Sequence, residues 1–112
     1  MTNHSVSREI KLIERDLYLD GSDQPIRLNP MEARLLATLL SYVNQPVSRT
    51  VLMRQVWETD FVEDTRTLEV HVSWLRRKIE ADPGRPRRLV TIRGLGYCLL
   101  VDDDSRDRDV AI

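Results

Sequence analysis

The stretch TRTLEVHVSWLRRKIE, residues Thr65–Glu80, decides the fold. At about 100° per residue, its long apolar residues fall on one narrow helical stripe formed by Leu68, Val72, Leu75 and Ile79. The opposite side mixes arginine, tryptophan and valine, and it comprises Arg66, Val70, Ser73, Trp74 and Arg77, with Thr67, His71 and Lys78 at the flank. A stripe of this kind packs against a core. The sequence therefore predicts a helix whose buried side is apolar and whose outward side is cationic and aromatic.

Length and composition indicate one ordinary globular domain. The chain has 112 residues, of which 41% are hydrophobic and 31% are charged, which suffices for a single core. One cysteine and two separate histidines make neither a disulfide nor a metal site. No phosphate-binding glycine loop, HExxH motif or nucleophile elbow is present. We therefore expect no cofactor, no metal and no enzyme activity.

The sequence also lacks the features of a membrane or secreted protein. Its apolar runs are too short to span a bilayer. The first residues, MTNHSVSREIK, have no apolar core of the signal-peptide type. We expect a cytoplasmic protein with no membrane partner.

Charge is distributed unevenly along the chain. The formal net charge is −1, yet residues 66–97 hold eight Lys/Arg and three Asp/Glu, a balance of +5, while residues 1–65 and 98–112 each sum to −3. Segregated charge carries information that the net charge hides. A nucleic-acid partner is thus compatible with the slightly negative total.

The expected elements follow in a clear order. Three β-prone runs, 10–13, 17–20 and 25–28, come first. Asn29, Pro30 and Glu32 have the pattern of a capped first helix, which residues 44–46 end. Ser48 caps a short helix from Arg49 to position 56 or 57, and residues 58–64 form an acidic loop.

Asp64 or Thr65 caps the third helix, which reaches about Ala81 before the stop at 82–86. Runs 89–93 and 97–101 then form a hairpin around Gly94 and Gly96. The order predicts an α+β fold, a winged helix-turn-helix with an N-terminal antiparallel sheet, three helices and a C-terminal β-hairpin wing. We expect residues 1–9 to be an N-terminal tail, 10–101 the domain, and 102–112 a charged C-terminal tail.

Three segments carry a resemblance to a known family: LNPMEARLLATLL (28–40), VSRTVLMRQVW (47–57) and DTRTLEVHVSWLRRKIEADPGRPRRLVTIRGLGYCL (64–99). Together they resemble the effector domain of the OmpR/PhoB family of transcriptional response regulators, over about residues 10–101. The closing motif VTIRGxGY is highly specific when it follows an RTxxVHxxxLRRK helix. The resemblance implies sequence-specific binding of double-stranded DNA, with the third helix (about 65–81) in the major groove and the wing (89–101) in the minor groove.

The resemblance also implies partners. In the family the domain follows a phosphorylatable receiver domain, binds direct repeats head to tail, and contacts RNA polymerase through the loop that corresponds to residues 58–64. A solvated loop that only links two helices is the alternative for that segment.

Several residues match DNA-contacting positions of the family. Val70 matches a position that packs on a thymine methyl group, and Arg93 matches the wing arginine that enters the minor groove. The remaining matches hold phosphates or are otherwise used for DNA, and they are Arg66, Thr67, His71, Arg76, Thr91, Tyr97 and Trp57. Arg77 points outward on the helical wheel. The alternative role of Tyr97 is that of a half-buried strand aromatic, and the alternative role of Trp57 is that of a core aromatic. Gly94 and Gly96 let the tip of the hairpin approach a DNA backbone closely, and the alternative is that they only form a tight turn.

Trp74 departs from the family pattern, which usually has arginine at this position. A tryptophan offers one N–H donor and a large apolar face, so it cannot bind guanine O6 and N7 as a fork. Our hypothesis is that Trp74 packs on a thymine methyl or sugar edge. The alternative is that it covers a neighbouring element and never touches DNA.

Other basic residues and the core complete the expectations. Arg85, Arg87 and Arg88 extend the positive field and are expected to be solvated. Core positions are the stripe of the third helix, Leu35, Leu36 and Leu39, and Cys98 is expected to be a buried or half-buried small apolar residue. A winged-helix module that binds protein rather than DNA remains the alternative function, because the net charge is negative and the guanine-reading arginine is missing.

Overall fold

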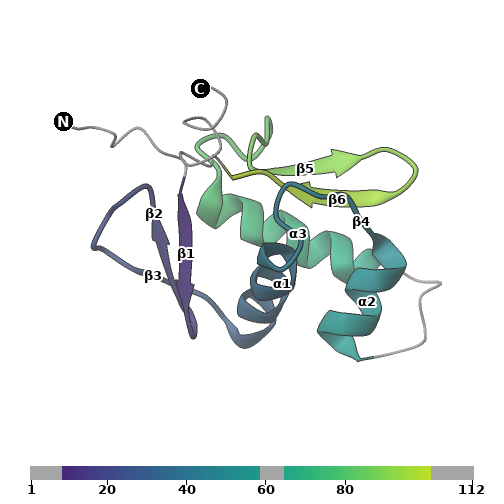
Figure 1. Ribbon diagram of the computed structural model, residues 1–112, viewed down its shortest axis with the longest axis horizontal. Coiled ribbons are helices and arrows are strands. Elements are labelled where there is room, and N and C mark those ends of the chain that lie inside the picture. The colour runs from purple at the N-terminus through teal and green to yellow at the C-terminus, as the bar shows by residue number, and fades with distance from the viewer. Residues whose placement is uncertain (1–8, 59–64, 102–112) are drawn as a thin grey trace, which may run out of the picture.

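A computed structural model describes residues 9–58 and 65–101 of the chain. In Figure 1 a small sheet lies at one end of the helices and a hairpin lies along them. The elements in chain order are β1 (Ile10–Ile13), β2 (Asp16–Leu19), β3 (Ile26–Arg27), α1 (Pro30–Leu40), β4 (Val47–Ser48), α2 (Arg49–Trp57), α3 (Arg66–Ile79), β5 (Leu89–Ile92) and β6 (Gly96–Leu99). This is the predicted winged helix-turn-helix, and the α+β expectation is confirmed.

The strands form two separate antiparallel sheets. The N-terminal sheet has the order β1-β2-β3, and its central register pairs Lys11 with Tyr18 and Leu12 with Leu17. The second sheet has the order β4-β6-β5, with Thr91 opposite Tyr97 in the hairpin. The hairpin β5–β6 is the wing (Figure 1).

Strand β4 was not expected from the sequence. It pairs antiparallel with β6, placing Val47 opposite Tyr97 and Ser48 opposite Gly96. Two residues are too few to show the alternation by which a strand is recognised. The pairing joins the start of α2 to the wing, so the wing is the edge of a three-stranded sheet rather than a free hairpin.

Helix α1 begins as predicted and ends earlier. The Asn29 side chain accepts from the Glu32 amide at 2.8 Å, and the Glu32 carboxylate accepts from the Asn29 amide at 2.9 Å, which completes the capping box. The expected extension toward Val43 is wrong, because α1 stops at Leu40 and the chain turns. Asn44, at a left-handed φ of 63°, then bonds the backbone of Val101 through both side-chain polar atoms.

The third helix differs from expectation at both ends. Thr65 occupies the cap position without a side-chain hydrogen bond, and Asp64 lies outside the described residues. The helix ends at Ile79 and not near Ala81, because Glu80 is extended, with φ −97° and ψ 141°.

One apolar cluster joins the helices and both sheets. The four α3 stripe residues that were predicted to face the core are buried. Cys98 and the three leucines predicted as core residues of α1 are buried as well. The cluster also includes Leu17 of β2, Leu28 directly after β3, and Leu89 and Leu99 of the wing. Packing of α3 against this cluster fixes which of its faces remains at the surface.

Candidate nucleic-acid interface

The outward face of α3 is exposed, as its sequence pattern predicts. Val70 and Trp74 expose 43% and 41% of their surface although both are large hydrophobic residues. The polar members of this face are also exposed: Arg66, Thr67, Ser73 and Arg77. The four stripe residues of the same helix are each 2% exposed or less. The helix therefore presents a broad surface of cationic and apolar side chains while its other side anchors it.

Three aromatic rings connect α3 with the end of α2. The His71 ring lies 5.1 Å from that of Trp57, edge to face, and 5.0 Å from that of Trp74. His71 Nδ1 is 2.8 Å from the carbonyl oxygen of Thr67, and because a carbonyl only accepts, this nitrogen carries the proton. Trp57 is partly buried and packs against the core cluster.

Arg76 connects α3 with the wing. Its Nε donates to the carbonyl oxygen of Leu89 and its Nη2 to the hydroxyl of Thr91, each at 2.9 Å. Burial lowers the pKa of this arginine, while Tyr97 and Glu80 oppose the change. Arg76 and Thr91 were both expected at the DNA surface. In the structure Arg76 instead donates a hydrogen bond to Thr91, and because Thr91 lies in β5, this bond positions the wing relative to α3.

Tyr97 lies deeper than either reading of the sequence expected. Its residue exposure is 4%, and two guanidinium groups lie over its ring, with Arg49 Cζ 5.2 Å and Arg76 Cζ 5.7 Å from the ring centre. Cation–π contacts of this kind hold the ring and both cations together. Arg93, in contrast, is exposed at the turn that follows β5.

Glu80 is a structural residue that sequence reasoning missed. Its buried carboxylate accepts hydrogen bonds from the amides of Arg87, Arg88 and Leu89 at 2.8–3.1 Å. These bonds attach the end of α3 to the start of β5. A lone glutamate after a helix carries no sequence signal for such a role, and neither does Arg49 at the start of α2.

Two cations of the basic segment are neutralised inside the protein. Lys78 bonds the buried carboxylate of Glu32 at 2.5 Å. Arg88 pairs with Asp20, and only 12% of its side chain is exposed, so the expectation of a solvated Arg88 is wrong. The acidic partner, Asp20, lies in the turn between β2 and β3, far from residues 85–88 in sequence, so the sequence around Arg88 does not indicate it. Arg85 and Arg87 are exposed, as predicted.

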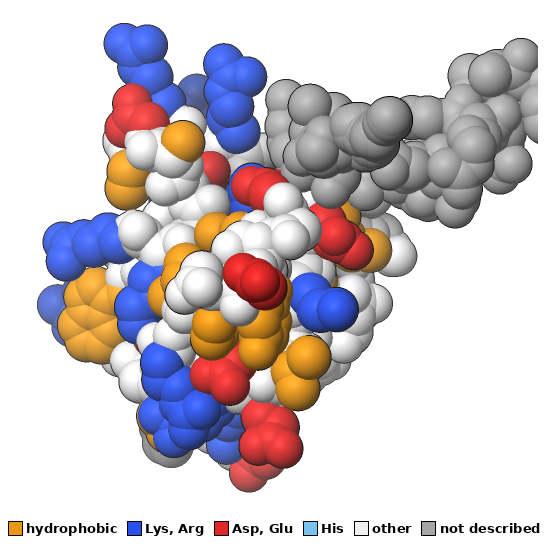
Figure 2. All heavy atoms as spheres, turned by 90° about the vertical axis from the view of Figure 1, so that its left-hand side faces the viewer, with side chains coloured by type: hydrophobic (Ala, Val, Ile, Leu, Met, Phe, Trp, Pro, Cys, Tyr) orange, Lys and Arg blue, Asp and Glu red, His pale blue; other side chains and the backbone are white. Residues whose placement is uncertain are grey.

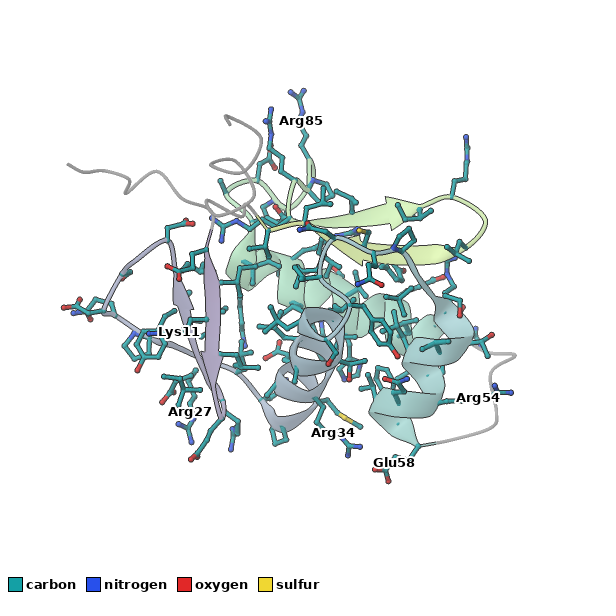
Figure 3. The ribbon with its side chains drawn as sticks, viewed as in Figure 1. Lys11, Arg27, Arg34, Arg54, Glu58 and Arg85 are labelled. Carbon is teal, nitrogen blue, oxygen red and sulfur yellow. The ribbon has the colours of Figure 1, made fainter. Side chains whose placement is uncertain are left out.

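The remaining charges are dispersed. Figure 2, viewed from the end formed by the N-terminal sheet, shows Lys and Arg side chains at the upper left, left and lower left and to the right of the centre, with Asp and Glu side chains interspersed among them. In Figure 3, Lys11 and Arg27 extend from the N-terminal sheet and Arg85 from the loop after α3. Arg34 of α1 pairs with Glu58 at 2.9 Å. These cations point in different directions, so they do not form a second continuous basic surface in this view.

Other kinds of site find no support in the described ranges. Residues 9–58 and 65–101 contain no group of three or more His, Cys, Asp or Glu arranged to hold a metal ion. In the same ranges no helix has the length and apolar character to cross a membrane.

Comparison with known proteins gives a consistent picture. The family model described as "Transcriptional regulatory protein, C terminal" matches residues 23–99. The sensory transduction protein RegX3 of Mycobacterium tuberculosis is 50% identical over 87 residues, which cover 78% of this chain and 38% of that protein. The chain spans about a third of the length of the curated relatives that it matches.

Solved structures agree. The DNA-binding domain of Bacillus subtilis CssR matches with a TM-score of 0.66 and 28% identity, covering 81% of this chain and 99% of that one. The response regulator DrrB, an OmpR/PhoB homologue from Thermotoga maritima, matches with a TM-score of 0.66 and 30% identity, covering 76% of this chain and 37% of that one. The chain therefore belongs to the OmpR/PhoB family of transcriptional response regulators, in which it corresponds to the C-terminal effector domain, a class of transcription regulators without enzyme activity.

Proposed function

We propose that this domain regulates transcription in the cytoplasm by binding double-stranded DNA, with α3 in the major groove and the wing in the minor groove. The carrying observation is the exposed outward face of α3, where Arg66, Val70 and Arg77 lie at the surface while the opposite stripe is buried. An α-helix with such a face fits the major groove, where each base pair shows a distinct pattern of donors, acceptors and methyl groups.

The predicted contacts divide into two kinds. Val70 and Trp74 face the base edges, and Arg93 reaches into the minor groove, where narrow A·T-rich segments concentrate negative potential. The proposed phosphate contacts set the register, and they come from Arg66, Thr67, His71, Thr91, Tyr97 and Trp57. Arg76 and Arg77 are proposed as further DNA-contacting residues. For Arg76, Thr91 and Tyr97 the internal bonds described above support a positioning role, through which each acts on the wing.

The family resemblance supports further partners. We propose that in the full-length protein the domain follows a receiver domain of a two-component system and pairs head to tail on direct repeats. The proposed contact with RNA polymerase falls on residues 58–64, of which 59–64 lie outside the described residues.

Salt dependence of DNA binding tests the proposal. Five arginines of residues 66–97 are exposed, and we propose that these supply phosphate contacts. At a slope of about −0.9 per phosphate contact, raising the salt from about 50 to 200 mM weakens binding roughly 10²–10³-fold. Fluorescence anisotropy on a duplex selected from a random pool measures this directly.

Matched variants locate the surface. Arg93→Ala should reduce the salt slope by about one. Arg27→Ala, at an arginine on the N-terminal sheet that pairs with Asp16, should leave the slope unchanged. A flat salt response, or a random pool that yields no enriched sequence, contradicts the proposal and favours a protein-binding module.

A further inference from the structure

Val70 and Trp74 form an apolar ridge on the groove-facing side of α3. The large hydrophobic side chains that stand exposed among the described residues are Ile13, Val70, Trp74, Leu95 and Leu100. Two of them lie four residues apart on one helix and are therefore neighbours on its surface. An exposed apolar pair in the middle of a cationic face gains free energy when its surface is buried against an apolar group of a partner.

The Trp74 side chain is supported from behind. Its ring contacts that of His71 at a tilt of 54°, and the His71 ring meets Trp57 at 78°. Both separations lie within the 4.5–7 Å typical of favourable aromatic pairs. The Nδ1–H bond of His71 to Thr67 fixes the imidazole on the helix. Trp74 is thus held by a ring that is itself held by a core-packed tryptophan.

The chemistry of the ridge limits what it can recognise on DNA. The apolar group that natural base pairs present in the major groove is the C5-methyl group of thymine. Valine offers no hydrogen bond, and the single N–H of tryptophan cannot bind guanine as a fork. Four residues of helix rise about 6 Å, and bases on one strand repeat every 3.4 Å or so. The two side chains therefore span about two base-pair steps.

We propose that Trp74, the neighbour of Val70 on the apolar ridge, selects a second thymine about two base-pair steps from the one expected at the Val70 position from the family resemblance. Trp74 is then a specificity-determining residue and His71 its positioning residue. The inference rests on the proposed function, because it requires α3 to lie in the major groove. It adds the chemical group that is read and the aromatic support that keeps the reader in place.

Deoxyuridine substitution provides a direct test, because it removes only the methyl group of thymine. In a duplex selected from a random pool, each thymine is replaced singly and Kd is measured by anisotropy. We expect two thymines about two steps apart to show about four-fold weaker binding each, the factor that corresponds to one buried methyl-sized group. Trp74→Ala should abolish the difference in Kd between the thymine and the uracil duplex at one of these positions. Val70→Ala should reduce that difference at the other position.

His71 needs a readout that a simple phosphate contact would not move. In His71→Ala, the thymine–uracil difference at the Trp74-dependent thymine should disappear, while that at the Val70-dependent thymine remains. His71→Phe keeps a ring between the tryptophans and should restore it. Equal weakening of the thymine and uracil duplexes by His71→Ala would overturn the positioning role.

A matched control and a distinct failure mode complete the design. Ile13→Ala removes an exposed apolar side chain of β1, 52% exposed, and should leave every thymine–uracil ratio unchanged. Steep salt dependence without any uracil-sensitive thymine, or sensitivity that persists in Trp74→Ala, overturns the ridge and leaves the proposed function standing. Absence of salt-dependent binding to any duplex overturns the proposed function itself.

Discussion

Gly96→Ala should destabilise the domain strongly, because the Gly96 position touches the backbone of β4. An added Cβ would lie 2.1 Å from the carbonyl oxygen of Val47 and 2.9 Å from the amide nitrogen of Arg49. Relief requires β4 and β6 to separate by about 1 Å, which breaks bonds that are about 2.9 Å long. Two or three lost hydrogen bonds at about 1 kcal/mol each, with overpacking of about 1–3 kcal/mol, give a loss of roughly 3–6 kcal/mol. That is a large part of the roughly 5–15 kcal/mol by which domains are stable.

Two other glycines provide graded controls for urea denaturation. Gly94 has a φ of +78° with no atom within 4 Å of an added Cβ, so Gly94→Ala carries only backbone strain, about 1–2 kcal/mol. Gly84→Ala, whose Cβ would meet one flexible carboxylate at 3.4 Å, should change the free energy of unfolding by less than about 0.5 kcal/mol. The urea midpoint should be highest for Gly84→Ala, lower for Gly94→Ala and lowest for Gly96→Ala, at a constant m-value. A Gly96→Ala variant as stable as Gly94→Ala would refute the reasoning.

Three further predictions concern the attachments of α3 and the wing. Glu80→Gln should lower the free energy of unfolding by about 1–3 kcal/mol, because an amide replaces a charged acceptor of three backbone bonds; an unchanged urea midpoint contradicts this. Arg76→Lys should cost about 1–2 kcal/mol, since one ammonium cannot reproduce the two directed bonds, whereas Arg77→Lys at the exposed neighbour should be neutral. Burial raises the pKa of the Cys98 thiol, so the unfolded chain loses this proton at lower pH than the folded one. The contribution of Cys98 to the free energy of unfolding should therefore be fully present below the pKa of the unfolded chain and be lost as pH rises through the pKa of the folded protein. Calorimetry of Cys98→Ala should show a smaller loss of stability at alkaline pH than calorimetry of the unchanged protein.

Much of the fold could be predicted because its signals are local. The α3 stripe repeats with the helical period, and the capping box of α1 is written in residues 29–32, so each element was recognisable from its own sequence. The exposed positions of Val70 and Trp74 followed from the same wheel. Burial of one side of a helix by a single core leaves the opposite side at the surface.

The attachments between elements could not be predicted in the same way. Arg88 and Asp20 lie 68 residues apart in sequence, and Glu80 bonds backbone amides whose position depends on the turn after α3. Tyr97 matches a family position for DNA contact, and only the tertiary structure shows that it is buried opposite β4 with two guanidinium groups over its ring. Such features depend on tertiary geometry, for which neither periodicity nor motif spacing provides a signal.

The double attachment of α3 to β5, through Arg76 and Glu80, has a consequence for base pairs that the protein never touches. Helix and hairpin are set at one separation before any duplex arrives. A duplex whose neighbouring grooves are spaced differently has to bend or narrow to meet both, and the energy of that deformation varies with the stiffness of its base-pair steps. The domain should consequently bind more tightly to duplexes whose base-pair steps between the two contacted grooves are easily deformed.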